Sequence, residues 1–512
     1  MKELLPIMGL LALATPAAAQ MQGADRSAAA QGAATITETD VARRIGVIAH
    51  DSMMGRDTPS RGLELTAQYI ADEFKRFGLK PGGENGSWFQ RYPIERAKLD
   101  IAASHVGLRY GDKHEHAGFD QAAIWRQGPV PKEEVGGAAL LVAGPVDAKT
   151  VDAALARDRV VLLVMDFTKP SSGSTEAVAM AMQKAGARAF VLVSNRDSGA
   201  FAQRLKGQAR ERTRLGSAAS TSPNAPQVPV IEVHERALAG ALASAGVTAA
   251  EARASSTGIV RPLDGIQVMV EGKETVQSAT APNTIGVLEG SDPALRSEYI
   301  VFSAHMDHDG VKAPVKGDSI WNGADDDASG TIGVVELAEA FAQKGARPKR
   351  SIIFMTVSGE EKGLWGSRWF SDHPTVPVQS MVANINLDMI GRNWKDTIAV
   401  IGKEHSDLGA TLNRVNAAHP ELGMTAIDDI WPNERFYFRS DHFNFARKGV
   451  PILFFFNGTH EDYHQPTDTP DKIDAEKEAR ILKLVYYLGQ EVGNAAERPK
   501  WKPESYEQIV EK

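Results

Sequence analysis

The sequence predicts an α/β fold: a mixed, mostly parallel sheet sandwiched by helices, with a smaller α/β domain inserted into it. The chain has 512 residues, which is too long for a single hydrophobic core and favours at least two domains. After about residue 262 the chain alternates strand and helix patterns. Four nearly continuous apolar runs are typical of strands buried on both faces: 299–304, 352–357, 382–387 and 451–456. Helical patterns at Thr331–Gln343 and Glu476–Val492 can cover such a sheet.

The composition excludes several classes of protein and of site. Hydrophobic residues make up 43% and charged residues 24%, which is typical of a globular chain. The formal net charge of -8 leaves no basic excess for nucleic-acid phosphates, so we expect no nucleic-acid partner. Cysteine is absent, which excludes disulfides, cysteine nucleophiles and thiolate metal sites. Any metal ion must therefore be held by His, Asp and Glu.

The N-terminus has the pattern of a secretory signal peptide. Lys2 precedes an apolar run from Leu4 to about Ala14, and small residues end the segment near Ala19. We expect residues 1–19 to be removed on export to the periplasm or the medium, and residues 20–35 to form a flexible leader. The apolar run is shorter than the roughly 20 residues that span a bilayer. We expect no membrane association after cleavage, and the sequence favours no particular oligomeric state.

The remaining chain divides into a discontinuous main domain, 36–126 and 262–512, and an inserted domain, 127–261. The first part of the main domain shows a helical pattern at Leu63–Phe77 and alternating, strand-like stretches over 87–125. The inserted domain shows three apolar strands and one helix, bracketed by polar stretches. Its predicted elements are the strands Val160–Met165, Ala189–Val193 and Val228–Val233 and the helix Glu176–Ala185.

Ionisable residues follow the predicted strands of the main domain directly. The strand at 299–304 leads to His305, the strand at 352–357 leads to Glu360 and Glu361, and the strand at 382–387 leads to Asp388. Two further acidic or histidine-rich segments are GADDDASG (323–330) and HEDYHQPTD (460–468). Because sites in open α/β sheets lie at the carboxyl ends of strands, we expect these segments to converge.

Imidazoles and carboxylates without thiols are a ligand set for zinc or a similar divalent ion. Two histidines and three acids exceed one tetrahedral site, but two ions that share a carboxylate would use all five. Such ion pairs activate a water molecule and polarise a carbonyl or phosphoryl oxygen. The adjacent Glu360 and Glu361 can divide the roles of general base and ligand. Asp307 is placed to hold the distal nitrogen of His305.

Six motifs in this order resemble the secreted co-catalytic di-zinc aminopeptidases, which are relatives of glutamate carboxypeptidase and the transferrin-receptor ectodomain. The motifs are SAHMDH, NGADDDASG, SGEEKGLWGS, NLDMIG, YFRSDHFNF and DYHQPTDT. The resemblance covers roughly 36–126 and 262–495 and implies the zinc exopeptidase fold. The inserted segment resembles a protease-associated domain.

The resemblance implies two Zn²⁺ per chain and a role for each matching residue. His305 and Asp388 would bind the first ion, Glu361 and His464 the second, and Asp326 both. The resemblance also implies a cis peptide between Asp326 and Asp327. It makes Glu360 the general base, Asp307 the partner of His305 and Tyr437 a donor to the oxyanion. His308, His442 and His460 are not assigned as ligands.

These assignments predict a zinc-dependent exopeptidase, an aminopeptidase that hydrolyses N-terminal residues of peptides with a water bridging the two metal ions and Glu360 as base. A carboxypeptidase or dipeptidase would use the same two ions with a different end-recognition pocket, so both stay open. A glutaminyl-cyclase-like acyltransferase is disfavoured, because a single-metal arrangement would be expected for it. A non-catalytic binding protein is disfavoured because no ligand is missing.

Overall fold

The computed structural model describes residues 27–169, 173–208, 210–216 and 227–511. The chain divides into two compact units. The first comprises Met1–Tyr92 and Thr280–Lys512, and the second comprises Pro93–Ala279. Each unit is built around its own sheet.

The first unit is built on most of the large sheet, whose strand order is β19-β18-β20-β17-β13-β16-β12-β2-β9, with β1 paired to β12; β9 and parts of β2 and β12 belong by residue range to the second unit. The strands β20, β17, β13 and β16 at its centre run parallel, while β12 pairs antiparallel with β16, and β18 pairs antiparallel with β20 and parallel with β19. The strands are β1 (Lys80–Pro81), β2 (Phe89–Leu99), β9 (Arg212–Leu215), β12 (Glu274–Leu288), β13 (Tyr299–His305), β16 (Ser351–Val357), β17 (Met381–Leu387), β18 (Thr397–Ile401), β19 (Thr425–Ile427) and β20 (Ile452–Phe456). A separate hairpin pairs β14 (Gly310–Val315) with β15 (Asp318–Trp321).

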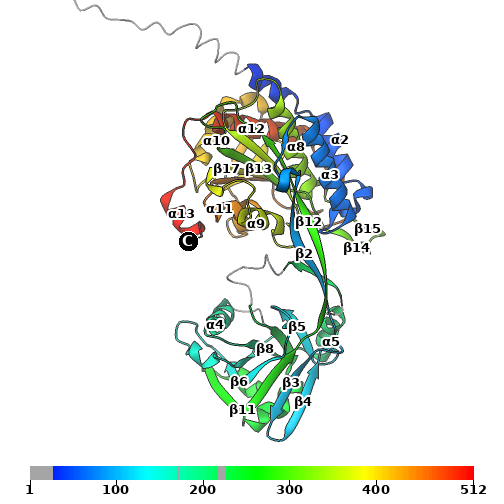
Figure 1. Ribbon diagram of the computed structural model, residues 1–512, viewed down its shortest axis with the longest axis vertical. Coiled ribbons are helices and arrows are strands. Elements are labelled where there is room, and N and C mark those ends of the chain that lie inside the picture. Colours follow the sequence, from blue (N-terminus) through cyan, green and yellow to red (C-terminus); the bar gives the residue numbers. More distant parts are fainter. Residues whose placement is uncertain (1–26, 170–172, 209, 217–226, 512) are drawn as a thin grey trace, which may run out of the picture. The chain divides into compact units, whose positions relative to one another are not determined.

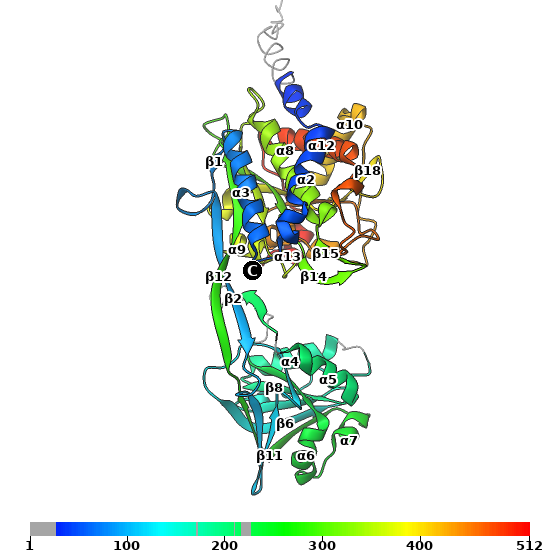
Figure 2. The same cartoon turned by 90° about the vertical axis from the view of Figure 1, so that its right-hand side faces the viewer.

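Helices cover both faces of this sheet. On one face α8 packs on β13, β16 and β17 and is flanked by α2, α3 and α12, as Figures 1 and 2 show. On the other face, Phe370 of α9 and Phe445 of α11 join a buried core with Val301 and Ile353. The helices are α2 (Glu38–Ile48), α3 (Arg61–Arg76), α8 (Gly330–Ala342), α9 (Trp365–Asp372), α10 (Leu408–Ala418), α11 (His442–Ala446), α12 (Ala475–Asn494) and α13 (Pro503–Ile509).

The predicted fold class is confirmed, because the four apolar runs form the parallel strands β13, β16, β17 and β20. All side chains of β16 and β17 are buried, as expected for strands covered on both faces. The helices predicted at Thr331–Gln343 and Glu476–Val492 are α8 and α12. Local sequence fixes α3 as well, since the Ser60 side chain accepts the backbone N–H of Leu63 and caps its first turn.

The second unit contains an eight-stranded sheet in the order β4-β3-β11-β6-β7-β8-β10-β5, with β6, β7, β8 and β10 parallel. Its strands are β3 (His105–Tyr110), β4 (Lys113–Gly118), β5 (Ala123–Gln127), β6 (Val135–Ala143), β7 (Val160–Val164), β8 (Ala189–Ser194), β10 (Val230–His234) and β11 (Ile259–Glu271). Its helices are α4 (Gly173–Lys184), α5 (Ser198–Gly207), α6 (Ala239–Ser244) and α7 (Ala249–Ala254). That this unit is a protease-associated domain stays a prediction.

The second unit begins earlier and ends later than the predicted insert at 127–261. The alternating stretches over 87–125 supply β3, β4 and β5, which pair with β11 and β10 of the second sheet rather than with the first. An alternating pattern identifies a strand with one buried face, but it does not identify the sheet to which that strand belongs.

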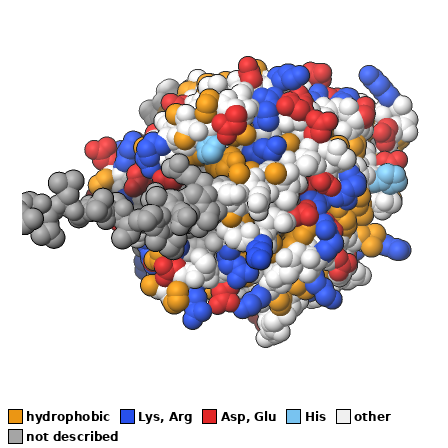
Figure 3. All heavy atoms as spheres, turned by 90° about the horizontal axis from the view of Figure 1, so that it is seen from above, with side chains coloured by type: hydrophobic (Ala, Val, Ile, Leu, Met, Phe, Trp, Pro, Cys, Tyr) orange, Lys and Arg blue, Asp and Glu red, His pale blue; other side chains and the backbone are white. Residues whose placement is uncertain are grey.

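The predicted leader is wrong for residues 27–34, which form a helix. This stretch is rich in alanine, the strongest helix former, and Ala33 is buried. The signal peptide predicted at 1–19 lies outside the described residues. Within the described ranges, no helix combines the length and apolar character needed to cross a bilayer. The face shown in Figure 3 intersperses acidic and basic side chains.

Candidate metal centre

The structure brings the five residues predicted as metal ligands to one edge of the first sheet. His305 is the last residue of β13, and Asp388 directly follows β17. Glu361 lies in the turn after β16, and His464 lies in the loop that follows β20. Asp326 lies in the short helical turn Ala324–Ser329 before α8, and its peptide bond to Asp327 is cis, as expected. The carboxyl ends of the parallel strands therefore converge as the sequence predicted.

One half of the cluster is formed by His305, Asp326 and Asp388, all of them buried. His305 Nε2 lies 3.3 Å from Asp326 Oδ1 and 3.6 Å from Asp388 Oδ1. The other carboxylate oxygen of Asp388 accepts the Ser440 hydroxyl at 2.8 Å. One imidazole nitrogen and two carboxylate oxygens thus face a common point.

The other half is formed by His464, Asp326 and Glu361. His464 Nε2 lies 3.0 Å from Asp326 Oδ2 and 3.3 Å from Glu361 Oε2. Asp326 therefore presents Oδ1 to the first histidine and Oδ2 to the second. This is the arrangement of a carboxylate that bridges two cations.

These distances and the unpartnered atoms fit zinc. Ligand atoms about 2.0–2.1 Å from a tetrahedral zinc ion lie about 3.3–3.4 Å from one another, close to the separations found here. Asp326 Oδ2 and Glu361 Oε1 are buried and have no hydrogen-bond partner. Such an atom loses its hydration on folding, and a bound cation would compensate for that loss.

Asp327 lies near the cluster but is already engaged. Its Oδ2 is 4.0 Å from His305 Nε2, yet it accepts the backbone N–H of His305 at 3.0 Å. Its Oδ1 accepts the backbone N–H groups of Gly330 and Met389. Asp327 is thus engaged by backbone donors, and Asp326 is the aspartate of this turn whose two oxygens face the two histidines.

The field of the cluster is strongly negative. Burial opposes the charge of His305, but Asp327 and Asp388 outweigh it and raise the pKa of the imidazole well above its ordinary value. Burial also opposes ionisation of Asp326, but His308, His305 and His464 outweigh it and hold the pKa of that carboxyl well below its usual range. The same field favours a bound divalent cation.

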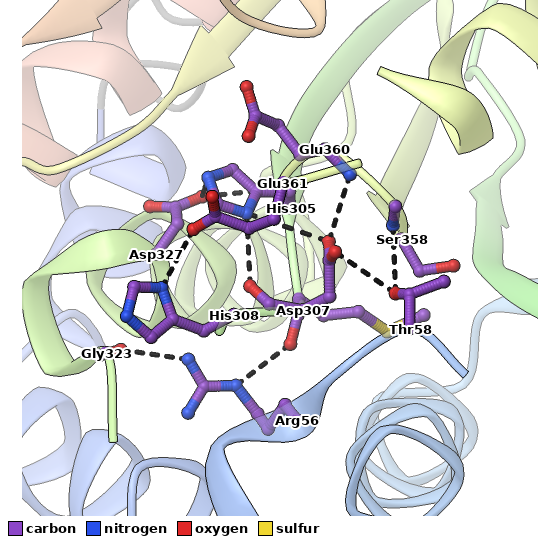
Figure 4. Close-up of polar contacts among 12 residues, drawn as sticks. Arg56, Thr58, His305, Asp307, His308, Gly323, Asp327, Ser358, Glu360 and Glu361 are labelled. Atoms are coloured by element: carbon purple, nitrogen blue, oxygen red, sulfur yellow. Dashed lines mark hydrogen bonds and ion pairs between the residues drawn. The ribbon is translucent and has the colours of Figure 1, made fainter. Parts of the chain in front are cut away.

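Glu360 also lines this cavity, but its carboxylate belongs to neither of the two groups of candidate ligands. It lines a small cavity of about 40 Å³ together with His305, Asp326, Asp388 and His464. Burial raises its pKa well above the ordinary value, with Asp441 and Glu361 adding to the effect and His305 opposing it. In Figure 4 the Glu360 side chain points away from Asp307, which accepts its backbone N–H at 3.2 Å.

Asp307 lies beside the distal nitrogen of His305, and its backbone carbonyl is nearer to that nitrogen than its carboxylate is. The distal nitrogen of His305, Nδ1, lies 3.2 Å from the backbone carbonyl of Asp307 and 3.8 Å from its carboxylate. The carboxylate instead accepts the Glu360 N–H and, at 3.0 Å, the Thr58 hydroxyl. Asp307 thus links the loop after β13 to the loop that carries the predicted base.

Tyr437 is not among the residues that line the cavity, and its role as oxyanion donor stays a prediction. Tyr437 is buried in the hydrophobic core that also contains Phe436, Ile401 and Ile452. Its hydroxyl is buried without a hydrogen-bond partner. The cavity wall is instead made by Phe436, Arg439, Phe454, Phe456 and Tyr463.

Arg56 and Thr58 contribute to the centre and were missed by sequence reasoning. The Arg56 side chain is fully buried and donates to the backbone carbonyls of Ile48, Met306, Asn322 and Gly323 at 2.5–3.0 Å (Figure 4). It therefore ties the loop after His305 to the segment before Asp326. Thr58 donates to Asp307 and accepts the backbone N–H of Gly359 at 3.1 Å. These residues are about 250 positions from His305 in the chain and match no metal motif, so no sequence signal pointed to them.

Asp468 is a third missed residue, although it belongs to the DYHQPTDT motif. Its carboxylate is buried and accepts the backbone N–H groups of Asp325 and Asp326 at 3.0–3.1 Å. It joins the loop of His464 to the turn of the bridging aspartate. Its place within the motif was the available signal.

The histidines not assigned as ligands lie in different surroundings. His442 stacks on Phe454, and its Nε2 lies 2.8 Å from the carbonyl oxygen of Tyr437. His460 Nε2 lies 3.1 Å from Asp325 Oδ2. His308 lies inside the cluster, 2.9 Å from Glu361.

Known proteins resemble this chain in the segment that carries the centre. Residues 283–489 match Peptidase family M28. A relative named probable leucine aminopeptidase, from Trichophyton verrucosum (strain HKI 0517), is 28% identical over 211 residues, which are 40% of this chain and 56% of the relative. A relative named probable zinc metalloprotease, from Pyrenophora tritici-repentis (strain Pt-1C-BFP), is 28% identical over 220 residues, 37% of this chain and 44% of the relative. The match thus spans about half the length of these relatives.

A solved structure shares the fold. The aminopeptidase from Aneurinibacillus sp. strain AM-1 superposes with a TM-score of 0.52 at 18% identity, covering 93% of this chain and 98% of that one. All five predicted ligands and Glu360 lie inside the matched segment.

Proposed function

We propose that this chain is an aminopeptidase that binds two zinc ions and hydrolyses the peptide bond next to a free amino terminus. The observation that carries the proposal is the bridging position of Asp326, whose oxygens lie 3.3 Å from His305 Nε2 and 3.0 Å from His464 Nε2. The aminopeptidase and zinc metalloprotease names of the relatives support it.

The donor set divides between two ions. His305, Asp326 and Asp388 would hold the first, and Asp326, Glu361 and His464 would hold the second. When bound, paired zinc ions lower the pKa of water and polarise the carbonyl that it attacks.

Glu360 moves the proton in the reaction. Its carboxylate takes a proton from the attacking water as the new carbon–oxygen bond forms. It then gives that proton to the amine nitrogen as the carbon–nitrogen bond breaks. The backbone hydrogen bond from Glu360 to Asp307 fixes the loop that carries this carboxylate. The aromatic wall of Phe436, Phe454 and Phe456 excludes water from the reacting groups.

A carboxypeptidase is the second candidate, because Arg439 supplies a cation to the wall of the same cavity. A guanidinium there could bind a terminal carboxylate. Hydrolysis of aminoacyl-anilides and of N-blocked peptides, with and without a chelator, separates the two candidates. Chelator-sensitive cleavage of the anilides alone supports the aminopeptidase, whereas removal of C-terminal residues from blocked peptides would overturn it.

We also infer that the protein is exported after cleavage near Ala19. The support is the charged, apolar and small-residue order of residues 1–19. N-terminal sequencing of the secreted protein tests this, and an intact Met1 in that fraction would contradict it.

A further inference from the structure

His308 is a buried histidine inside the cluster that the proposed ligand set leaves unused. Its side chain has no exposed surface, and neither of its ring nitrogens has a hydrogen-bond partner. It lies three residues after His305, beyond the end of β13. Figure 4 shows its ring turned toward Glu361.

The unpartnered atoms around His308 face one another. His308 Nδ1 lies 2.9 Å from Glu361 Oε1 and 3.7 Å from Asp326 Oδ2. Both of these oxygens are themselves buried without a hydrogen-bond partner. A buried polar atom without a partner destabilises the folded state, and here three such atoms face one point. A cation between the three atoms would satisfy all of them.

We propose that His308 is a further ligand of the second zinc ion, through Nδ1. This inference rests on the dinuclear centre proposed above and changes its composition. The second ion would then be held by His308, His464, Glu361 and Asp326, and the first by His305, Asp326 and Asp388.

The arrangement of the two imidazoles agrees with this assignment. The rings of His308 and His464 have centroids 5.6 Å apart and are inclined at 76°. Two imidazoles bound to one zinc ion at about 2.0–2.1 Å place their ring centroids about 5 Å apart. Glu361 presents Oε1 toward His308 and Oε2, at 3.3 Å, toward His464. Glu361 thus lies between the two rings and can contact the same ion.

The assignment makes the two ions unequal. Four protein groups complete a tetrahedral shell, which is typical of a zinc ion held for structure, whereas three leave a position open for water or substrate. The second ion is therefore the more firmly enclosed, and the first keeps its open position. Loss of His308 should affect one ion and spare the other.

The experiment compares three variants in which phenylalanine keeps a ring but removes the nitrogens. These are His308→Phe, His464→Phe as a ligand change in the same half, and His442→Phe as a matched control. His442 is also fully buried against an aromatic ring, and it lies outside the cluster. Zinc affinity is measured by titration of the metal-free proteins, and the number of imidazoles per zinc by X-ray absorption of the loaded proteins. Circular dichroism confirms that each variant is folded.

We expect three imidazoles shared by two zinc ions in the wild type and in His442→Phe. We expect two imidazoles in His308→Phe, with one zinc weakened by more than about 100-fold, the upper end for groups that only support a ligand. His464→Phe should weaken the same ion. If His308→Phe fails to fold, the imidazole count of the wild type decides alone.

Two outcomes would overturn this inference. One is a wild type with two zinc ions but only two imidazoles, which would mean that His308 only donates a hydrogen bond to Glu361. The other is His308→Phe binding both ions with wild-type affinity. A wild type that binds no zinc would instead contradict the proposed function, so the two failures are distinguishable.

Discussion

The candidate metal centre of the first unit and a cavity of the second unit both contain several charged side chains. The two sites differ in whether those side chains have interaction partners. The second unit encloses about 650 Å³, against about 40 Å³ at the metal centre. In the larger cavity, Arg126, Arg196, Lys169 and Asp166 each lie within 3.5 Å of an opposite charge. Arg196 lies 2.9 Å from the buried Glu232, and Lys169 lies 3.2 Å from Asp166.

At the metal centre several ligand atoms have no partner at all. Among the described residues, the groups of three or more His and acidic side chains that could hold a metal ion all lie in the first unit. Volume shows where a ligand fits, whereas several unpartnered ligand atoms that face one another indicate a candidate cation site. The comparison therefore assigns the chemistry to the smaller cavity.

The largest effect that tests this comparison should come from Glu360→Gln. Glutamine keeps the shape of the side chain but cannot accept and return a proton, so kcat should fall by about 10²–10⁴-fold. Zinc content should not change, because Glu360 lies outside the proposed ligand set. The matched control is Glu176→Gln, which changes a glutamate of the larger cavity. Steady-state kinetics and a zinc count check both, and equal losses in the two variants would contradict the comparison.

Arg56→Lys should have the next largest effect. Lysine keeps the positive charge, but its single ammonium cannot reach all four of the carbonyls that Arg56 binds. The loops of His305 and Asp326 should loosen, and zinc affinity should fall by about 10–100-fold, as for other groups that orient metal ligands. Arg196→Lys in the second unit should leave zinc affinity unchanged. Zinc titration decides, and unchanged affinity in Arg56→Lys would show that the loops hold without it.

His442 tests whether every unpartnered buried nitrogen indicates a metal ion. Its Nδ1 has no partner, but it packs against Phe454 and lacks the two carboxylate oxygens that face His308. Burial lowers the pKa of His442 to about 3, opposed only weakly by the carbonyl of Tyr437. We therefore expect a neutral core histidine that binds no metal.

This assignment predicts a pH dependence of stability. The folded pKa lies below the unfolded value of about 6.5, so the residue has no effect above that pH. As the pH falls below 6.5, the unfolded chain binds a proton that the folded chain does not. The free energy of unfolding should fall by about 2 kcal/mol at pH 5. Urea unfolding of the wild type and His442→Gln, both with chelator, measures the difference in slope, and parallel slopes would contradict it.

The central strands and the candidate metal ligands could be predicted from the sequence for a physical reason. Strands buried on both faces must be apolar throughout, so β13, β16, β17 and β20 are visible as continuous runs. The carboxyl ends of these strands lie at one edge of the sheet, so the residues that follow the strands lie close together.

The residues that orient the ligands were not predictable in the same way. Arg56 donates to backbone carbonyls, which every residue carries, so its partners cannot be identified from their residue types. Tyr437 shows the converse, because its place in a motif did not determine which way its ring points. His308 looked like an ordinary neighbour of a ligand until the fold placed it beside Glu361.

The smallest effect is expected for a substitution in the cavity of the second unit. Met180 is a partly exposed side chain of the larger cavity, 39% accessible in the structure. Met180→Ser should change the free energy of unfolding by no more than about 0.5 kcal/mol, as is usual for surface positions. It should leave zinc content and kcat unchanged, because no atom of this cavity belongs to the metal centre. A fall in kcat of tenfold or more, at full zinc content, would show that the second unit takes part in the reaction. The contrast between paired and unpaired charge would then not suffice to locate the chemistry.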